Sequence, residues 1–378
     1  MTATTVERTD GRAAVAVFLL NGLTMSTYIV RLPALKHDLG LGDATVGAIG
    51  VVFALSALAA MQGVGGLVRR FGTAAVLRVS LAGLPVLLAA TGLSGNVITL
   101  AVAVAALGAV HGTTDTAMNA HAVAVERRTG PLLNRCHAAW SISTVTASLA
   151  SAGAARLDLG TGVFVVSVSG ALLVAGLALG RGLRAPGAAP RLPDSREPAR
   201  WTRPLVLLGV TGTVLMVCEG AALGWGVLLV RDAKGATLGV ATLAVTAYTA
   251  AQTAARLLGD RLTTRVQAPT IFRAGLALAA LGFGASALAP GPWFAVAAFT
   301  VMGLGMAFPL PLAFSAVGTL AGDEVAPAMA RFTTFTYGGI LLGPALVGGV
   351  AEFTGLPAVV ATLAAVLVSV NLAYRLPS

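Results

Sequence analysis

Charged side chains are scarce in this sequence. Asp, Glu, Lys and Arg make up 11% of its 378 residues, whereas a typical soluble domain has about 25%. A soluble protein of this length would have too few charges to cover its surface. Intrinsic disorder is excluded too, because it requires low hydrophobicity and 56% of these residues are apolar.

Several chemical signatures are also missing. The two cysteines, Cys136 and Cys218, lie in apolar stretches and define no disulfide framework. The sequence has no P-loop, no H-E-x-x-H, no G-x-S-x-G and no Cys/His cluster with metal-ligand spacing. We therefore expect a protein that is not an enzyme and that binds no cofactor and no metal.

Long apolar runs are abundant instead. Runs of about 20 apolar residues are typical of membrane helices, and the sequence contains twelve. They cover residues 13–33, 44–68, 74–94, 97–124, 136–156, 162–182, 204–230, 239–258, 269–289, 293–318, 327–351 and 357–375. The connections between them are too short for a folded soluble domain. Pro309 and Pro311 predict a kink in the tenth run.

The basic residues show a strong sidedness. The net charge of +10 first suggests nucleic acid as a partner. With the N-terminus placed inside, however, 20 of the 25 cations fall on the inner side. The basic excess is thus an orientation signal, and it predicts cytoplasmic termini and no nucleic-acid partner. The preference for Arg over Lys is typical of a GC-rich bacterium, so we expect a multi-pass protein of the bacterial cytoplasmic (inner) membrane.

The chain also shows an internal repeat. Segment 183–203 is rich in Pro and Arg and predicts a flexible cytoplasmic linker between two halves, 1–182 and 204–378. Similar loops follow the second and eighth runs, and Arg70 aligns with Arg261 at an offset of 191 residues. The repeat predicts two pseudo-symmetric bundles of six helices each.

These features resemble the major facilitator superfamily. Its signature loop between helices 2 and 3, roughly G-x-L-A-D-R-x-G-R-[RK], is matched at Gly65, Leu67, Arg70 and Gly72, whereas Arg69 stands in place of the acid. More locally, the segment 115–128 resembles a bacterial branch of the superfamily that is often called YbjJ-like. So do Arg135-Cys-His137 and Glu219-Gly220.

The second-half copy of the loop keeps the acid, as Arg256-Leu-Leu-Gly259-Asp260-Arg261. The resemblance implies an all-α membrane protein with twelve transmembrane helices in the major facilitator fold. It also implies that this loop gates transport on the cytoplasmic side. Arg256 and Asp260, at positions i and i+4, form an ion pair that we expect to be made and broken during transport. The alternative is a static interfacial ion pair worth about 1 kcal/mol or less.

Two acids lie inside the apolar runs, Asp115 in the fourth and Glu219 in the seventh. An acid at the bilayer centre costs about 2.5–3.5 kcal/mol on insertion scales, so both acids are candidates for proton coupling. His111, Asp115 and Asn119 recur every four residues and share one helix face. This face predicts a His–Asp proton relay or a substrate contact. The alternative is a structural tie between the third and fourth helices, for example from Asp115 to Arg78.

The repeat offset places Glu219 at the position of Tyr28, with Arg31 one turn further out. We expect Arg31 either to pair with Glu219 or to snorkel to the outer interface. The candidates for the substrate cavity are polar or amphipathic side chains within the runs. They are Asn21, Tyr28, Arg31, Asn119, Trp225, Tyr248, Gln252 and Tyr337.

The resemblance and the two acids predict a monomeric secondary active transporter that moves a small organic molecule by alternating access. We expect proton-coupled export, as an antiporter for efflux of a drug-like compound or metabolite, because the predicted cavity is mostly apolar. Two alternatives stay open. One is proton-coupled uptake of a sugar-like or other polar nutrient, and the other is a non-transporting membrane sensor.

Overall fold

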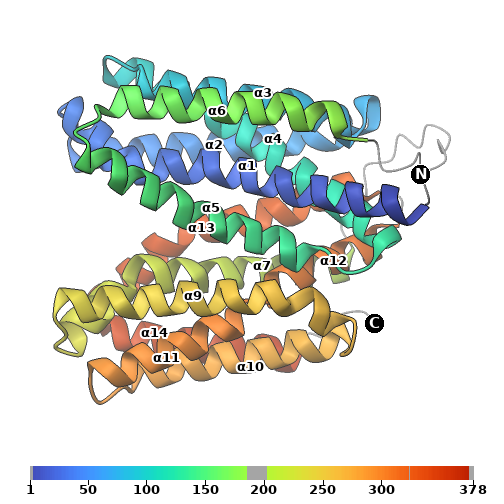
Figure 1. The fold of residues 1–378 in the computed structure, drawn as a ribbon. Helices are drawn as coiled ribbons and strands as arrows, with labels where there is room; N and C mark the ends of the chain where they lie inside the picture. Colours follow the sequence, from blue (N-terminus) through green and yellow to red (C-terminus); the bar gives the residue numbers. More distant parts are fainter. Residues whose placement is uncertain (1–2, 185–201, 323, 374–378) are drawn as a thin grey trace. The chain divides into compact units, whose positions relative to one another are not determined.

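The computed structural model describes residues 3–184, 202–322 and 324–373, and every regular element in these ranges is a helix (Figure 1). The chain forms two compact units. Unit 1 comprises Met1–Leu132, Ala139–Ala199 and Asp323–Arg331, and unit 2 comprises Leu133–Ala138, Arg200–Gly322 and Phe332–Ser378. Most of the predicted linker lies outside the described residues.

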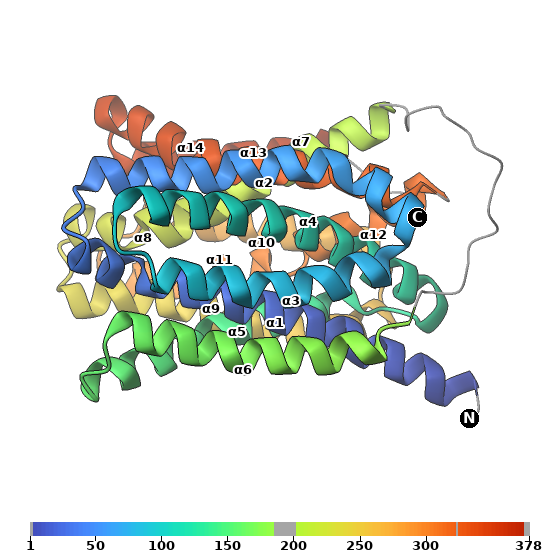
Figure 2. The same cartoon turned by 90° about the horizontal axis from the view of Figure 1, so that it is seen from above.

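Unit 1 is built on six helices. They are α1 (Ala3–Asp38), α2 (Asp43–Phe71), α3 (Thr73–Gly92), α4 (Val97–Thr129), α5 (Leu133–Arg156, from Ala139 on) and α6 (Thr161–Gly182). Helix α4 packs against α1, α2 and α3. Helix α6 lies alongside α3 and α1 (Figure 2).

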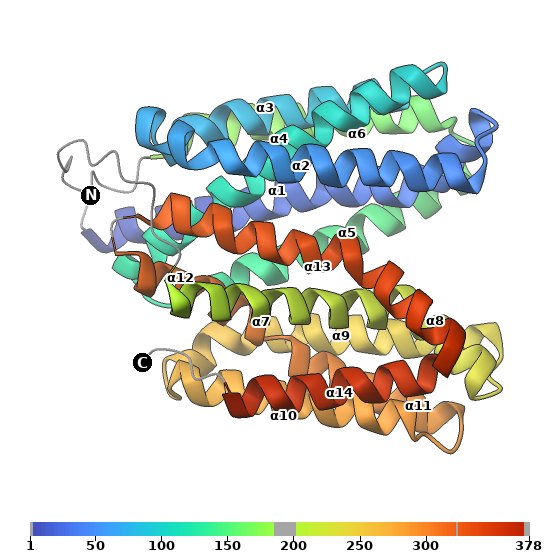
Figure 3. The same cartoon turned by 180° about the vertical axis from the view of Figure 1, so that it is seen from behind.

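Unit 2 begins with α7 (Arg203–Gly220), which continues through a π-helical turn η1 (Ala221–Trp225), the short α8 (Gly226–Leu228) and a second π-helical turn η2 (Leu229–Ala233). It continues with α9 (Leu238–Thr263), α10 (Ala268–Ala287), α11 (Pro292–Met306), α12 (Pro309–Ala321), α13 (Val325–Thr354, from Phe332 on) and α14 (Leu356–Ala373). Helix α10 packs between α11 and α14, and α9 packs on α11 (Figure 3).

All twelve apolar runs of the sequence fold as helices. Nine segments of the described chain are long and apolar enough to cross a membrane. The other three predicted spans are α5, α9 and α13, with 24, 26 and 30 residues. Their length suffices for a bilayer, and in α9 the lower hydropathy comes from a polar face that is described below.

Local sequence signals set several helix ends. The Asn96 side chain accepts hydrogen bonds from the backbone N–H groups of Ile98 and Thr99 and caps α4. Gly72 ends α2 with φ +79 and Gly130 ends α4 with φ +86, a conformation that favours glycine. The kink predicted from Pro309 and Pro311 is confirmed, since α11 ends at Met306 and α12 begins at Pro309.

Glycine contacts confirm the offset of the repeat. An added Cβ at Gly112 of α4 would lie under 3.0 Å from the carbonyl oxygen of Ala57 in α2. In unit 2, an added Cβ at Gly303 of α11 would also lie under 3.0 Å from the carbonyl oxygen of Tyr248 in α9. Both glycines and both carbonyls are 191 residues apart, the offset predicted from the loops. Close backbone approach through small residues is a common way to pack membrane helices.

Candidate functional site

A line of buried polar side chains runs along one face of α9. Tyr248, Gln252, Arg256 and Asp260 follow each other at intervals of four residues and therefore share that face. Their exposed fractions are 0%, 3%, 6% and 7%. We call these four residues the α9 polar stripe. Buried polar groups need hydrogen-bond partners, because leaving them unpaired is costly. The partners of the four residues therefore indicate the role of the stripe.

Glu219 of α7 meets the start of this stripe. The Tyr248 hydroxyl donates to Glu219 Oε2 at 2.7 Å, and Gln252 Nε2 donates to both carboxyl oxygens at 3.1 and 2.9 Å. Glu219 comes two residues before the π-helical turn that starts at Ala221. Such turns are rare and often occur at functional sites. The structure thus joins three predicted candidates into one hydrogen-bonded group.

Arg256 occupies the next turn of α9. Its Nε donates to the carbonyl oxygen of Ala307 at 3.2 Å, in the break between α11 and α12. The positive charge of the stripe therefore lies on the same face of α9 as the two side chains that donate to Glu219.

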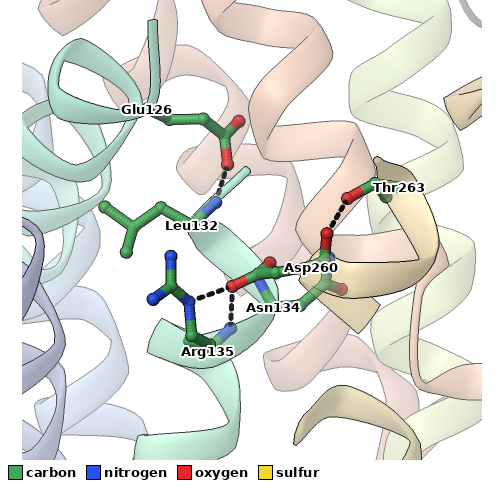
Figure 4. A network of polar contacts seen from close by, with 6 residues as sticks. All are labelled: Glu126, Leu132, Asn134, Arg135, Asp260 and Thr263. Carbon is green, nitrogen blue, oxygen red and sulfur yellow. Dashed lines mark hydrogen bonds and ion pairs between the residues drawn. The ribbon is translucent and has the colours of Figure 1, made fainter. Parts of the chain in front are cut away.

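Asp260 is bound to the first turn of α5, at the helix ends that the charge pattern predicts to be cytoplasmic. Its carboxylate accepts from the backbone N–H groups of Asn134 at 3.2 Å and Arg135 at 3.3 Å, and from Arg135 Nε (Figure 4). The sequence predicted Arg256 as the partner of Asp260, and this was wrong: the ion pair is with Arg135. The spacing rule considers one helix only, whereas the open N–H groups of α5 attract the carboxylate from a second helix.

Among the remaining residues of the two loops, two glycines lie close to neighbouring side chains and two arginines are exposed. An added Cβ at Gly259 would lie 2.6 Å from the Cγ atom of Asn134, so α9 approaches α5 closely there. In unit 1, an added Cβ at Gly65 would lie 3.2 Å from the Pro327 ring. Arg70 is exposed and its guanidinium lies 5.0 Å from the centroid of the neighbouring Phe71 ring. Arg261 is exposed as well.

In unit 1, the predicted polar face of α4 contacts α1. His111 Nδ1 is 3.1 Å from Asn21 Oδ1, and Asn21 Nδ2 donates to the Met118 sulfur at 3.3 Å. Asn119 Nδ2 donates to the backbone carbonyl of Asp115 at 2.8 Å. His111 and Asn119 are 5% and 1% exposed, so this face is buried, and the side chain of Asp115 lies between them, half-buried.

The pairing of Asp115 with Arg78, given as an example of a structural tie, was wrong. Arg78 donates from Nε to the carbonyl oxygen of Gly180 at 2.8 Å and from Nη2 to the carbonyl oxygen of Leu183. Its guanidinium therefore fixes the end of α6. The Asp115 carboxyl keeps a position on the buried face of α4 without this tie.

The expectation that Arg31 snorkels to the interface was also wrong. Arg31 is 6% exposed, and its guanidinium lies over the ring of Phe164 at 4.3 Å. Tyr28, one turn earlier, stacks on Phe53 with the ring centroids 6.0 Å apart. The predicted Arg31–Glu219 pair would join the two units and stays a prediction.

Two aromatic candidates occupy different environments. Trp225 lines a cavity of about 10 Å³ in unit 2 together with Phe283 and Phe299, and its ring would lie 2.7 Å from a Cβ added to Gly348. We therefore assign Trp225 to packing. Tyr337 is half-buried on α13. Within the described ranges, no three His, Cys, Asp or Glu side chains gather as metal ligands.

Apolar helices of membrane-spanning length and polar groups buried inside the helical units are typical of a multi-pass membrane transporter. Comparison with known proteins supports this class. A family model described as "Major Facilitator Superfamily" matches residues 208–377. The uncharacterized transporter y4wD of Sinorhizobium fredii is 32% identical over 91% of this chain and 92% of its own length. An uncharacterized MFS-type transporter of Yersinia pestis is 26% identical over 95% of this chain and 93% of its own.

Solved structures show the same fold. The Escherichia coli fucose:proton symporter FucP matches with a TM-score of 0.81 at 15% identity, over 96% of this chain and 97% of its own. The human organic anion transporter MFSD10 matches with a TM-score of 0.74 at 13% identity, over 97% and 99%. The chain belongs to the major facilitator superfamily. It is a membrane-embedded transporter with the twelve-helix fold, and it is not an enzyme.

Proposed function

We propose that this transporter couples the movement of a small organic molecule to protons by alternating access, with Glu219 as the main proton carrier. The observation that carries the proposal is the set of groups around the Glu219 carboxylate. The side chains that bind it directly, Tyr248 and Gln252, are both neutral donors. A carboxylate held in this way inside a membrane span can exchange a proton without breaking a tight ion pair.

Asp115 is the second carrier in this proposal. It lies in unit 1 on the buried face of α4 that also presents His111 and Asn119. Arg78, which the structural alternative offered as its partner, binds the end of α6 instead. One acid in each unit gives two groups that can be loaded and unloaded with protons at different stages of transport.

The charge pattern supports cytoplasmic termini in a bacterial inner membrane, and we propose a monomer that exports its substrate. A specific observation favours uptake of a polar compound as the second candidate. The expectation of export rested on a mostly apolar interior, whereas Tyr248, Gln252 and Arg256 form a buried row of hydrogen-bonding groups next to Glu219. A fucose:proton symporter and a proton:xylose symporter share this fold.

A substrate screen in proteoliposomes with an imposed pH gradient tests the proposal. Compounds that enter against their own gradient when the outside is acidic move together with protons, and compounds that require an acidic lumen move against protons. The direction of the effective gradient therefore separates uptake from export.

The key variants are Glu219→Gln and Asp115→Asn. We expect both variants to bind substrate, but to accumulate at least tenfold less of it under the imposed pH gradient than the wild type does. The matched controls are Glu352→Gln and Asp232→Asn, which remove exposed acids and should transport normally. Normal accumulation by both Glu219→Gln and Asp115→Asn across a range of pH would refute the proton-coupling role.

A further inference from the structure

Arg31 is a buried cation, and one hydrogen-bonding edge of its guanidinium group is unsatisfied. Its exposed fraction is 6%, and its Nε and Nη2 atoms are buried without a hydrogen-bond partner. Burying a charged donor without an acceptor is among the most costly arrangements in a protein interior. Arg31 therefore requires an acceptor that the described residues of unit 1 do not supply.

The two open atoms lie on the same edge of the guanidinium group. Nε–H and Nη2–H point in parallel, and this edge is the one that binds a carboxylate through two N–H···O bonds. The flat face of the group is already used, because it lies over the Phe164 ring at 4.3 Å. What stays open is thus the geometry of a carboxylate receptor.

Tyr28 provides another unsatisfied donor on the same face of α1. It precedes Arg31 by three residues and therefore shares its face of α1. The Tyr28 hydroxyl is also buried and has no hydrogen-bond partner, in a residue that is 6% exposed. Two neighbouring side chains with unsatisfied donors indicate one shared acceptor more readily than two separate ones.

Aromatic rings extend from this point into unit 1. Tyr28 stacks on Phe53 at 6.0 Å, Phe53 on His111 at 5.6 Å, and His111 lies 6.0 Å from Trp140. Phe53 and Trp140 are only half-buried, so parts of their rings are open to a ligand. A row of rings beside a cation matches a flat, apolar molecule with an acidic group.

The internal acids do not fill the site. Ion pairs of the described residues in unit 1 include Arg128 with Asp10, and none involves Arg31. Glu219, the partner predicted from the repeat, already accepts from Tyr248 and Gln252 inside unit 2. An external anion is therefore the better candidate for the open edge of Arg31.

We propose that Arg31 and Tyr28 form the carboxylate-binding subsite of this transporter, and that its substrates are small organic acids with an aromatic body. The carboxylate is bound by Arg31 Nε and Nη2 and by the Tyr28 hydroxyl, and the aromatic body packs along Phe53 and Trp140. This inference rests on the proposed transport function and specifies its substrate class.

Equilibrium binding to the purified protein tests the subsite without requiring transport. The probes are benzoate and phenylacetate, with benzamide and phenylacetamide as uncharged counterparts of the same shape. The measurement is the thermal unfolding midpoint and isothermal titration in a lipid-free neutral detergent, where no anionic headgroup can supply the charge. We expect the carboxylates to bind at least tenfold more tightly than the amides, and to raise the unfolding midpoint more than the amides do.

Four variants locate the binding. Arg31→Gln should weaken carboxylate binding at least tenfold, and Arg31→Lys at least threefold, because lysine keeps the charge but lacks the two parallel donors. Tyr28→Phe should weaken it about threefold, because it removes one hydrogen bond. Arg156→Gln, which changes an exposed arginine of unit 1, is the matched control and should bind normally. If Arg31→Gln does not fold, Arg31→Lys and Tyr28→Phe still decide.

The proposal is overturned if neither carboxylate binds the wild-type protein, or if the variants at Arg31 and Tyr28 bind them as well as the wild type does. Glu219→Gln separates this result from the proton-coupling proposal. It should lose coupled transport but bind benzoate with unchanged affinity. A protein that binds no carboxylate but still moves protons with another substrate would refute the subsite alone.

Discussion

Arg256 donates a hydrogen bond from Nε to the carbonyl oxygen of Ala307, the carbonyl that Pro311 leaves without a helical donor. In an unbroken helix, the N–H of residue 311 would bind this oxygen, but proline has none. A side chain of α9 thus satisfies the backbone of the break between α11 and α12. Membrane helices tolerate proline where such a replacement donor is available.

This relationship predicts a compensating pair of substitutions. Arg256→Met should lower the thermal unfolding midpoint, because it leaves the Ala307 carbonyl unsatisfied at a cost of about 1–3 kcal/mol. Pro311→Ala restores an N–H four residues after Ala307. We expect Pro311→Ala to recover about 1 kcal/mol in the Arg256→Met background, because it supplies one hydrogen bond.

The measurement is a double-mutant cycle of unfolding midpoints in detergent. Pro311→Ala alone should change stability less than it does together with Arg256→Met. Additive effects of the two substitutions would show that Arg256 does not stabilise the break through Ala307.

Asp260 leads to a ranking of substitutions. Its ion pair with Arg135 involves an arginine side chain that is 54% exposed, so the pair contributes about 1 kcal/mol or less. The carboxylate also accepts from the backbone N–H groups of Asn134 and Arg135, and each unsatisfied donor costs about 1–3 kcal/mol. We expect Asp260→Ala to destabilise much more than Arg135→Gln.

Arg261→Gln is the control for this ranking, since it alters an exposed neighbour on the same helix and should be neutral. The thermal unfolding midpoints of the three variants in the same detergent provide the comparison. An equal loss for Arg135→Gln and Asp260→Ala would mean that the ion pair dominates and that the capping of α5 contributes little.

The helices were predictable from the sequence because each depends on a local property. Twenty apolar residues in a row satisfy their backbone only as a helix in a bilayer, and Pro309 and Pro311 break such a helix wherever it lies. The repeat was predictable for the same reason, since the loops after α2 and α9 carry similar residues.

The contacts of the site were only partly predictable. Glu219, Tyr248 and Gln252 were each identified as candidates, but no spacing rule relates α7 to α9, so their hydrogen bonds could not be derived. Asp260 shows the same limit. Its helical neighbour Arg256 was the visible partner, whereas the first turn of α5 lies 125 residues away in the sequence. The assignment to the YbjJ-like branch stays a prediction.

Each unit has one close glycine contact at the equivalent position, and substituting either glycine should destabilise the protein to a similar extent. Gly112→Ala and Gly303→Ala should each destabilise the protein by about 1–3 kcal/mol, because the new methyl group meets a backbone carbonyl that cannot move aside. Alanine gains about 0.5–1 kcal/mol in helix propensity over glycine, which is too little to offset the clash.

Gly170→Ala is the matched control, since Gly170 is an exposed residue of α6 and an added Cβ there meets nothing within 4 Å. It should stabilise slightly or have no effect. The unfolding midpoints of the three variants decide the matter, and a neutral Gly112→Ala or Gly303→Ala would contradict the close approach at that position.

The orientation of the protein can be tested with added cysteines, because the two native ones provide a silent background. Cys136 and Cys218 are both 0% exposed and should not react with a membrane-impermeant maleimide in intact cells.

The sidedness of the cations predicts that Gly95, between α3 and α4, faces outward and that Thr264, at the end of α9, faces the cytoplasm. Both residues are exposed and an added side chain at Gly95 meets no neighbour. We therefore expect Gly95→Cys to be labelled in intact cells and Thr264→Cys to be labelled only after the membrane is permeabilised. The opposite pattern would place the termini outside and reverse the direction in which Asp260 and the first turn of α5 face.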